Sequence, residues 1–269
     1  MDQPALFSPR RVGPGTDLLP AYVPLPGLGI LPVNAYVVHA AQPVLVDTGI
    51  AALQEGFMRA LRRLIDPAAL QWIWLTHADA DHVGNLRAVL AEAPNARIVT
   101  NYLGVGKLGL LQFPPERCYL LNPGQALDVG DRRLLAHRPP VYDAPETMAA
   151  YDTRTGHLFT SDCFGAVMQE PADDAAAIAP AALHEGLSLW TRIDAPWLAQ
   201  IGRDQLATAS RPLRDLRARL LLGSHLPPAA GLDERLYAGL AAAQGAEPFV
   251  GPDQAALEQA ARARDTALA

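Results

Sequence analysis

The feature that most constrains this chain is the segment WLTHADADHVGN, residues 74–85, which places four potential metal ligands within six residues. These ligands are His77, Asp79, Asp81 and His82. The preceding LQWIWLT is apolar and typical of a buried strand, and the following VGNLRAVLAEAP has the apolar spacing of a helix. A tight loop between a strand and a helix can direct all four side chains into one site. The segment therefore predicts a metal site at the end of a strand.

Strand and helix patterns alternate along the rest of the chain. Strands are predicted in NAYVVHA, QPVLVDTG, LQWIWLT, ARIVTN, GQALDVGDRRLLAHRPP, ETMAAYDTRTGHLFTSD and ARLLLGSH. Helices are predicted at residues 50–65, 83–94 and roughly 103–112, through the Ala- and Leu-rich residues 173–220, and within the C-terminal residues 232–269. This order predicts sheets covered by helices. With half of its residues hydrophobic, the chain is long enough to form a single domain over residues 1–269.

The composition argues against several classes of protein. A net charge of −6 disfavours non-specific binding to nucleic acid, and no apolar run is long enough to span a membrane. The segment MDQPALFSPRRVGPG lacks the apolar centre of a signal peptide. Cys118 and Cys163 are the only cysteines, which is too few for a disulfide framework or a cysteine-rich metal site. We therefore expect a cytoplasmic protein that binds neither nucleic acid nor membrane.

Histidines and carboxylates also follow other predicted strands. The candidates are His137 or Asp143, then Asp162, then His225. In one shared site, His77 and Asp79 would face one ion. Asp81 and His82 would face a second ion, and Asp162 would bridge both. The alternative is that Asp79 and Asp81 are solvated carboxylates that cap the next helix and that His77 is a core histidine.

Four motifs, LVDTG, THADADHVGN, SDCFG and GSH, occur in this order. They resemble the metallo-β-lactamase superfamily, which implies an αββα sandwich of two sheets flanked by helices, with a two-metal site. Within it, the chain is most similar to the di-iron domain of flavodiiron proteins and related oxygen-binding di-iron proteins, which carry H-x-E-x-D-H where the hydrolases carry H-x-H-x-D-H. The resemblance covers about residues 28–230 and implies that the helical residues 173–220 cover the metal pocket. No flavin site is visible in the chain.

The resemblance implies a ligand set for two metal ions. One ion would be held by His77, Asp79 and Asp162, and the other by Asp81, His82, Asp162 and His225. The family's remaining ligand is a histidine two residues before a proline, and here Asp143 stands two residues before Pro145. This alignment favours Asp143 as the last ligand, with His137 as the alternative or as a donor that orients a ligand. Without the resemblance, Asp143 is a turn carboxylate in a proline-rich loop.

The expected ligand set carries much negative charge. With Asp143 included, it has three neutral histidines and four carboxylates, whose charges balance two divalent ions. Oxygen-rich ligand sets suit iron and manganese, whereas zinc prefers more nitrogen and sulfur. Histidines in place of Asp79 and Asp143 would leave a positive field that acidifies bound water, as hydrolysis requires. We therefore expect two ions, iron before manganese or zinc, and a di-iron oxidoreductase that binds or reduces O₂ or NO.

Two other functions use the same residues. A zinc or manganese hydrolase would cleave an ester, lactone, thioester or phosphoester with metal-bound hydroxide. A gas sensor would bind its ligand without turnover. In each case the expected partner is a small molecule or a diatomic gas. The redox function also needs a separate electron donor, and a homodimer is a further possibility.

Four other residues carry an expectation. Asp47, in LVDTG, is expected to anchor a ligand by a hydrogen bond. Asn34 and Tyr36 are expected to pack beneath the site. His184 lies in the helical segment expected to cover the pocket, where it is either a surface histidine or the donor of a proton to bound oxygen.

Overall fold

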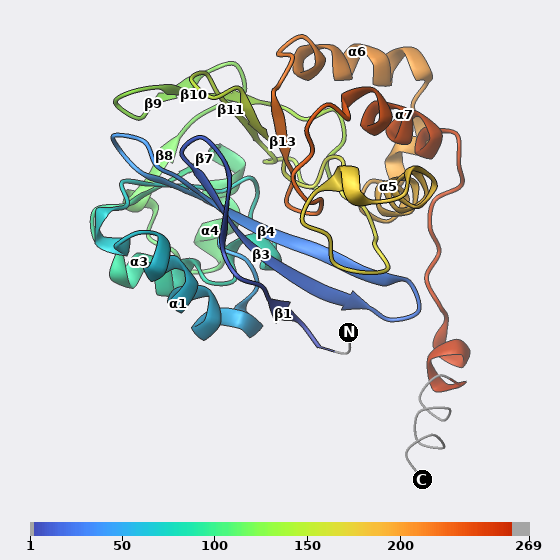
Figure 1. Ribbon diagram of the computed structural model, residues 1–269, viewed down its shortest axis with the longest axis horizontal. Helices are drawn as coiled ribbons and strands as arrows, with labels where there is room; N and C mark the ends of the chain where they lie inside the picture. Colours follow the sequence, from blue (N-terminus) through green and yellow to red (C-terminus); the bar gives the residue numbers. More distant parts are fainter. Residues whose placement is uncertain (1–2, 260–269) are drawn as a thin grey trace.

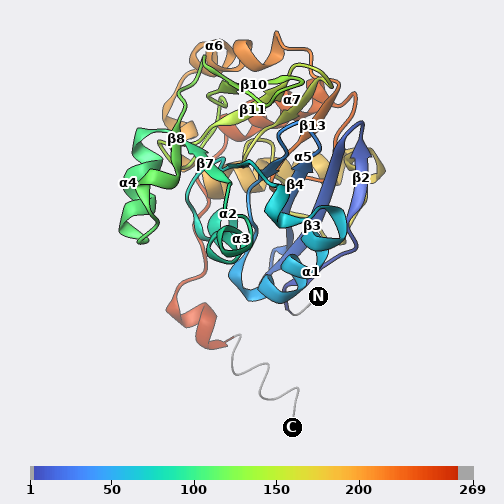
Figure 2. The ribbon, with the colours of Figure 1, turned by 90° about the vertical axis from the view of Figure 1, so that its left-hand side faces the viewer.

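The computed structural model describes residues 3–259, in which two β-sheets pack face to face with helices on both outer surfaces (Figures 1 and 2). Both sheets are built mainly from short strands in which apolar residues predominate. This arrangement confirms the αββα sandwich predicted from the motifs.

The first sheet contains eight strands in the order β1-β3-β4-β5-β6-β7-β8, with β2 paired to β3. The long strands β3 and β4 are antiparallel, whereas β5 to β8 are parallel to one another. The strands are β1 (Ala5–Leu6), β2 (Arg10–Gly13), β3 (Thr16–Leu25), β4 (Gly29–Val38), β5 (Val44–Val46), β6 (Trp72–Trp74), β7 (Arg97–Thr100) and β8 (Cys118–Leu120). The parallel part places the ends of β5 and β6, and hence Asp47 and the 77–82 loop, at one edge of the sheet.

The second sheet contains five strands in the order β13-β12-β11-β10-β9. Its strands are β9 (Ala126–Asp128), β10 (Arg133–His137), β11 (Ala149–Asp152), β12 (His157–Phe159) and β13 (Leu220–Leu222). The predicted hairpin around DTRTG is confirmed as β11 and β12, which are antiparallel. Strand β13 lies parallel to β12, so the loops that follow these two strands leave the sheet at the same end.

Helices cover the outer surfaces of both sheets. They are α1 (Gln54–Leu64), α2 (Ala80–Val83), α3 (Leu86–Glu92), α4 (Tyr102–Leu110), α5 (Pro180–Asp194), α6 (Arg203–Arg214) and α7 (Asp233–Gln244). Short 3₁₀ helices occur at Ala51–Leu53, Pro67–Ala69, Pro115–Arg117, Ala175–Ala177 and Pro196–Gln200. Figure 1 shows α1 and α3 near the first sheet and α5, α6 and α7 grouped beside the second.

Three apolar layers hold this sandwich together. Because side chains alternate along a strand, neighbouring residues enter different layers. Leu45 packs with α1 and α3 outside the first sheet, whereas Val44 and Val46 face the second sheet. In the second sheet, Phe159 joins the layer between the sheets, whereas Leu158 packs with α5, α6 and α7. Both sheets are therefore buried on both faces, which places their reactive groups at the strand ends.

Three parts of the chain bear on the expectations from sequence. Strands β1 to β3 were not predicted, because the polar and proline residues within them obscure the alternation. Helices were predicted within residues 232–269, and the structure has α7 and a further helical turn at 254–259 there. Residues 260–269 lie outside the described part. A single domain over residues 1–269 stays a prediction. Within residues 3–259, no helix combines the length and apolarity needed to cross a membrane.

Candidate metal centre

The 77–82 segment leaves β6 and enters α2. Asp79 is the residue before α2, but its side chain makes no capping hydrogen bond. Its carboxylate instead lies 3.5 Å from Nζ of Lys107 and is 46% exposed. The helix-capping alternative for Asp79 therefore has no support, and the histidines of the segment are both buried.

Three separate loops complete the cluster. Asp143 lies in the loop between β10 and β11, Asp162 follows β12, and His225 follows β13. Because β12 and β13 are parallel neighbours, the loops after them start side by side, and the main-chain N–H of Ser224 donates to the carbonyl oxygen of Ser161. The fold thus assembles this set from positions far apart in the sequence.

Asp162 lies at the middle of the cluster. Its Oδ1 is 3.1 Å from Nε2 of His82 and 3.2 Å from Nε2 of His225, whereas its Oδ2 is 3.6 Å from Nε2 of His77. On one side, Asp81 Oδ2 lies 3.4 Å from Nε2 of His225. The two oxygens of Asp162 therefore face two separate sets of side chains, as a bridging carboxylate requires.

Two further distances define these sets. Nε2 of His77 is 3.9 Å from Oδ1 of Asp143, and Nε2 of His82 is 3.6 Å from Oδ2 of Asp81. Potential ligand atoms within 4.8 Å of one another group as His77, His82 and Asp162; Asp81, His82 and His225; His77, Asp79 and Asp143; and Asp143, Asp162 and Asp194. All seven ligands predicted from sequence belong to these groups.

In each of the three histidines, Nδ1 contacts another protein group, whereas Nε2 has no hydrogen-bond partner. Nδ1 of His82 bonds Asp47, Nδ1 of His225 bonds the carbonyl oxygen of Pro32, and Nδ1 of His77 lies 3.2 Å from the Ser161 hydroxyl. The Nε2 atoms of all three, and Oδ1 of Asp162, are buried without a hydrogen-bond partner. Buried polar atoms without partners are costly, and two metal ions, one on each side of Asp162, would satisfy all four. The residues present therefore fit a metal centre.

Asp47 makes the most extensive of these supporting contacts. Its Oδ2 lies 2.9 Å from Nδ1 of His82 and accepts a hydrogen bond from the Thr76 hydroxyl, while its Oδ1 accepts from the Thr76 main-chain N–H. Asp47 has a positive φ of 55°, a conformation that aspartate tolerates better than most residues. The expected anchoring contact of Asp47 is present.

Asn34 and Tyr36 hold the loop that carries His225. The Asn34 amide donates to the carbonyl oxygens of Gly223 and Leu226, and the Tyr36 hydroxyl donates to that of Gly223. Gly165 also shapes this region, because a Cβ there would lie 2.8 Å from Cβ of His225 and 2.4 Å from Nε1 of Trp190. Only glycine permits this close packing.

Charge is concentrated in the centre when no ion compensates it. Burial opposes ionisation of Asp162, but His225, His77 and His82 together hold its pKa well below its usual range. Burial raises the pKa of Asp143, with contributions from Asp162 and Asp79 that oppose the effect of His77. Burial, followed by the charges of Asp162 and Asp143, raises the pKa of Asp194 to about 8. The carboxylates outnumber the histidines, so a bound cation would relieve their repulsion.

Two histidines considered from sequence lie apart from these groups. His137 ends β10, and burial lowers its pKa; its Nε2 is buried without a partner, but the residue belongs to none of the metal-ligand groups. His184 is exposed on α5, because Leu183 and Leu187 occupy the buried face of that helix. The structure does not bring His184 into the cluster, and the position of Asp143 supports it over His137 as the ligand.

Sequence reasoning missed three residues that the structure brings to the centre. Trp190 of α5 packs its ring 4.7 Å from that of His225 and donates to the main-chain oxygen of Asp162. Asp194 lies one turn later on the same face. Lys107 of α4 pairs with Asp79 and with the buried Glu146, from which it lies 2.7 Å. The i, i+4 spacing of Trp190 and Asp194 was the only available signal.

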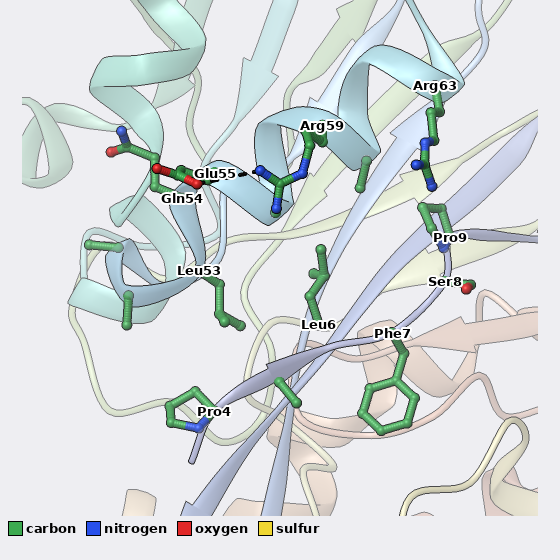
Figure 3. A pocket seen from close by; sticks show the side chains of 15 residues that line it. Pro4, Leu6, Phe7, Ser8, Pro9, Leu53, Gln54, Glu55, Arg59 and Arg63 are labelled. Carbon is green, nitrogen blue, oxygen red and sulfur yellow. Dashed lines mark hydrogen bonds and ion pairs between the residues drawn. The ribbon is translucent and has the colours of Figure 1, made fainter.

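A separate hollow of about 700 Å³ lies between the N-terminal segment and α1. Figure 3 shows Leu6, Phe7, Arg59 and Arg63 around it, with Arg59 paired to Glu55. None of the candidate metal ligands lines this hollow.

Comparison with known proteins gives the family. The model of the metallo-beta-lactamase superfamily matches residues 28–212. This chain belongs to that superfamily. The match includes six of the seven candidate ligands, and His225 lies beyond it.

Among proteins of the metallo-beta-lactamase superfamily, this chain is 30% identical to the anaerobic nitric oxide reductase flavorubredoxin of Salmonella typhi, over 49% of this chain and 28% of the relative. Rubredoxin oxygen:oxidoreductase of Desulfovibrio gigas superposes with a TM-score of 0.76 at 18% identity, covering 88% of this chain and 61% of the other. A flavo di-iron protein variant from Thermotoga maritima gives 0.76 at 19% identity, covering 89% and 61%. The predicted resemblance to flavodiiron cores is confirmed for the fold. The chain spans 23 to 28% of the length of the curated relatives it matches.

Proposed function

We propose that this chain holds a dinuclear metal centre and acts as an oxidoreductase on O₂ or NO. The proposed ligands are His77, Asp79, Asp143 and Asp162 for one ion and Asp81, His82, Asp162 and His225 for the other. The observation that carries the proposal is the set of buried Nε2 atoms without partners around the shared carboxylate of Asp162. Metal ions would satisfy these atoms together, because each Nε2 lies 3.1 to 3.6 Å from an oxygen of the one shared carboxylate.

The composition of the ligand set supports iron. Asp79 and Asp143 add two negative charges to the side of the centre around His77. Carboxylate oxygens favour hard ions that change oxidation state, whereas a zinc hydrolase gains from neutral histidines that leave the ion strongly acidic. When bound, two iron ions would supply the electrons and the open positions that reaction with a diatomic gas requires. The names of the relatives, a nitric oxide reductase and an oxygen oxidoreductase, support this class of reaction.

The side chains of the chain itself would orient the ligands and exclude water. Asp47 fixes the ring of His82, and the carbonyl oxygen of Pro32 fixes that of His225, so that each Nε2 points to the centre. Trp190 covers the ring of His225, and its indole N–H holds the main chain of Asp162. The partly exposed Asp79 and Asp143 leave one side of the centre accessible to a small molecule or gas.

The redox function needs an electron donor. The described residues contain no cysteine-rich cluster site, because Cys118 and Cys163 are single and separate cysteines. We therefore propose that a separate redox partner delivers the electrons to the carboxylate-rich side of the centre. The proposal also includes a homodimer.

The test begins with metal content, measured by elemental mass spectrometry on protein expressed without added metal and purified without oxygen. We expect about two irons per chain, and an optical spectrum of the reduced protein that changes on addition of O₂ or NO. A reduced, iron-loaded protein whose spectrum ignored both gases would contradict the proposal. Two zinc ions retained through dialysis would favour hydrolysis instead and direct the next assays to esters and lactones.

A further inference from the structure

Asp194 is a carboxylate that none of the family motifs in the sequence includes. It is the last residue of α5. Asp143, Asp162 and Asp194 each offer one carboxylate oxygen, and these oxygens lie within 4.8 Å of one another. Among residues 3–259, no hydrogen bond or ion pair engages the Asp194 side chain. The chain thus places a third carboxylate against two proposed ligands without giving it a partner.

The position of Asp194 is electrostatically unfavourable in the absence of a cation. The C-terminal end of a helix carries a partial negative charge, which repels a carboxylate. Two further carboxylates within 4.8 Å add to this repulsion. A divalent ion at this point would convert three repulsive interactions into attractive ones.

Independent contacts hold Asp194 in this place. One turn before it, Trp190 donates a hydrogen bond of 3.2 Å to the main-chain oxygen of Asp162. Three residues after it, Trp197 donates a hydrogen bond of 2.8 Å to the main-chain oxygen of Tyr142, the residue before Asp143. The end of α5 is therefore fastened to both loops that carry the neighbouring carboxylates, so the proximity of Asp194 is built into the fold.

A second observation points to a cation in this cluster. Nε2 of His77 is buried without a hydrogen-bond partner, and His77 is 1% exposed. This nitrogen lies 3.6 Å from Oδ2 of Asp162 and 3.9 Å from Oδ1 of Asp143, which are two of the three carboxylates. Acidic side chains alone would not explain an unpartnered imidazole nitrogen, whereas an ion would accept electron pairs from all of these groups.

We propose that Asp194 is an additional carboxylate ligand of the metal centre, on the ion that His77 and Asp143 bind. The inference rests on the proposed function in one respect, because it assumes that the centre holds two ions. With Asp194, the centre has five carboxylates and three histidines. The ion beside Asp194 would then be held mainly by oxygen, which favours a hard and highly charged cation.

The experiment compares the full chain with Asp194→Asn and with Asp215→Asn. Asp215 is a matched control, because it is also an acid at the C-terminal end of a helix but is exposed and outside every candidate ligand group. Metal-free proteins are titrated with Mn²⁺ by calorimetry and with Co²⁺ by absorption. We expect Asp194→Asn to weaken one of two binding events about 10- to 100-fold, since even an outer partner of a ligand has effects of that size. The Co²⁺ bands should also change, because the ion loses an oxygen ligand.

Thermal unfolding separates a ligand from a structural residue. A ligand role predicts that Asp194→Asn leaves the melting temperature of the metal-free protein unchanged or higher, and reduces the rise in melting temperature that Mn²⁺ produces. A lower melting temperature of the metal-free protein, with the rise retained, would assign Asp194 a structural role and overturn the inference. Asp194→Ser, which also removes the carboxylate, gives the same readouts if the asparagine variant does not fold.

The outcomes distinguish the two proposals. If the unmodified chain binds fewer than two ions, the proposed dinuclear function fails. If it binds two ions and Asp194→Asn binds both within twofold of the same affinity, with an unchanged Co²⁺ spectrum, only the role of Asp194 is overturned. A loss of affinity in Asp215→Asn as large as in Asp194→Asn would also overturn it, because general loss of negative charge would then explain the effect.

Discussion

The candidate centre has two halves that share Asp162. The histidine-rich half contains Asp81, His82 and His225, and the carboxylate-rich half contains His77, Asp79 and Asp143. The histidine side chains of both halves are 1% exposed, whereas Asp79, Asp81 and Asp143 are 46%, 32% and 23% exposed. The histidines thus lie in the core, and two of the three exposed carboxylates belong to the carboxylate-rich half. On the proposed function, a gas or an electron donor would meet more exposed ligands at the carboxylate-rich half.

The supporting contacts follow the same division. In the histidine-rich half, Asp47 and the carbonyl oxygen of Pro32 are buried acceptors for the imidazole rings. In the carboxylate-rich half, Asp79 lies beside Lys107, a residue that is itself 39% exposed. A charged pair at the surface is weakly held compared with a buried one. We therefore expect the histidine-rich half to bind its ion more rigidly.

The largest expected effect comes from the residue that joins the halves. Asp162→Asn removes the charge that faces all three histidines, so both ions should be lost together. Metal analysis after dialysis should show less than about a tenth of the ions bound by the unmodified chain. Retention of one full equivalent would show that the halves bind independently, and would remove the bridging role of Asp162.

The next effect tests the charge of the carboxylate-rich half alone. Asp143→His replaces a carboxylate by a neutral nitrogen ligand, so this half should shift its preference from iron or manganese toward zinc by about tenfold. Competition between Mn²⁺ and Zn²⁺ for the metal-free protein measures the shift. His137→Gln is the control, because His137 belongs to neither half. An equal shift in both variants would argue that Asp143 does not bind the ion.

A smaller effect compares the side chains that orient the histidines of the two halves. Asp47→Asn weakens the contact that orients His82, and should lower affinity for one ion about tenfold. Ser161→Gly removes the hydroxyl beside His77 in the other half, and glycine accepts the φ of 57° found there. We expect a weaker effect of this variant, because a hydroxyl supports an imidazole less than a carboxylate does. Calorimetric titration in which Ser161→Gly had the larger effect would reverse the proposed order of rigidity.

The smallest effect concerns a carboxylate outside both halves. Burial raises the pKa of Asp17, but hydrogen bonds with Arg11 and His39 outweigh it and lower the net pKa below the usual value of 3.8. Since the pKa is depressed in the folded state, Asp17 stabilises the fold above pH 3.8, and this contribution is lost as the pH falls through the folded pKa.

Asp17→Asn should therefore lower the free energy of unfolding by on the order of 1 kcal/mol at pH 6, and by progressively less below pH 4. Chemical denaturation at several pH values measures the difference. Metal content at pH 7 should stay unchanged, because Asp17 belongs to neither half. A difference that grew toward acid pH would show that the pKa of Asp17 is raised instead.

Much of the candidate centre could be predicted from the sequence. His77 to His82 lie between a strand and a helix whose apolar periods are visible locally, so their common direction follows from short-range geometry. Asp162 and His225 end apolar strands, and two parallel strands must release their following loops at the same end. The layered fold also follows, because strands that are apolar on both faces need helices on both sides.

The tertiary structure decided the rest. His137 and Asp143 were both candidates, and only the course of the 138–148 loop brings Asp143 to within 3.9 Å of His77. Strands β1 to β3 pair with neighbouring segments of the chain, but their polar and proline residues obscure the apolar alternation by which a strand is predicted. Trp190 and Asp194 reach the centre because α5 packs across it, and Lys107 reaches Asp79 from another helix. Local spacing determines which way a side chain points from its own element, whereas contacts between distant elements depend on how the layers pack.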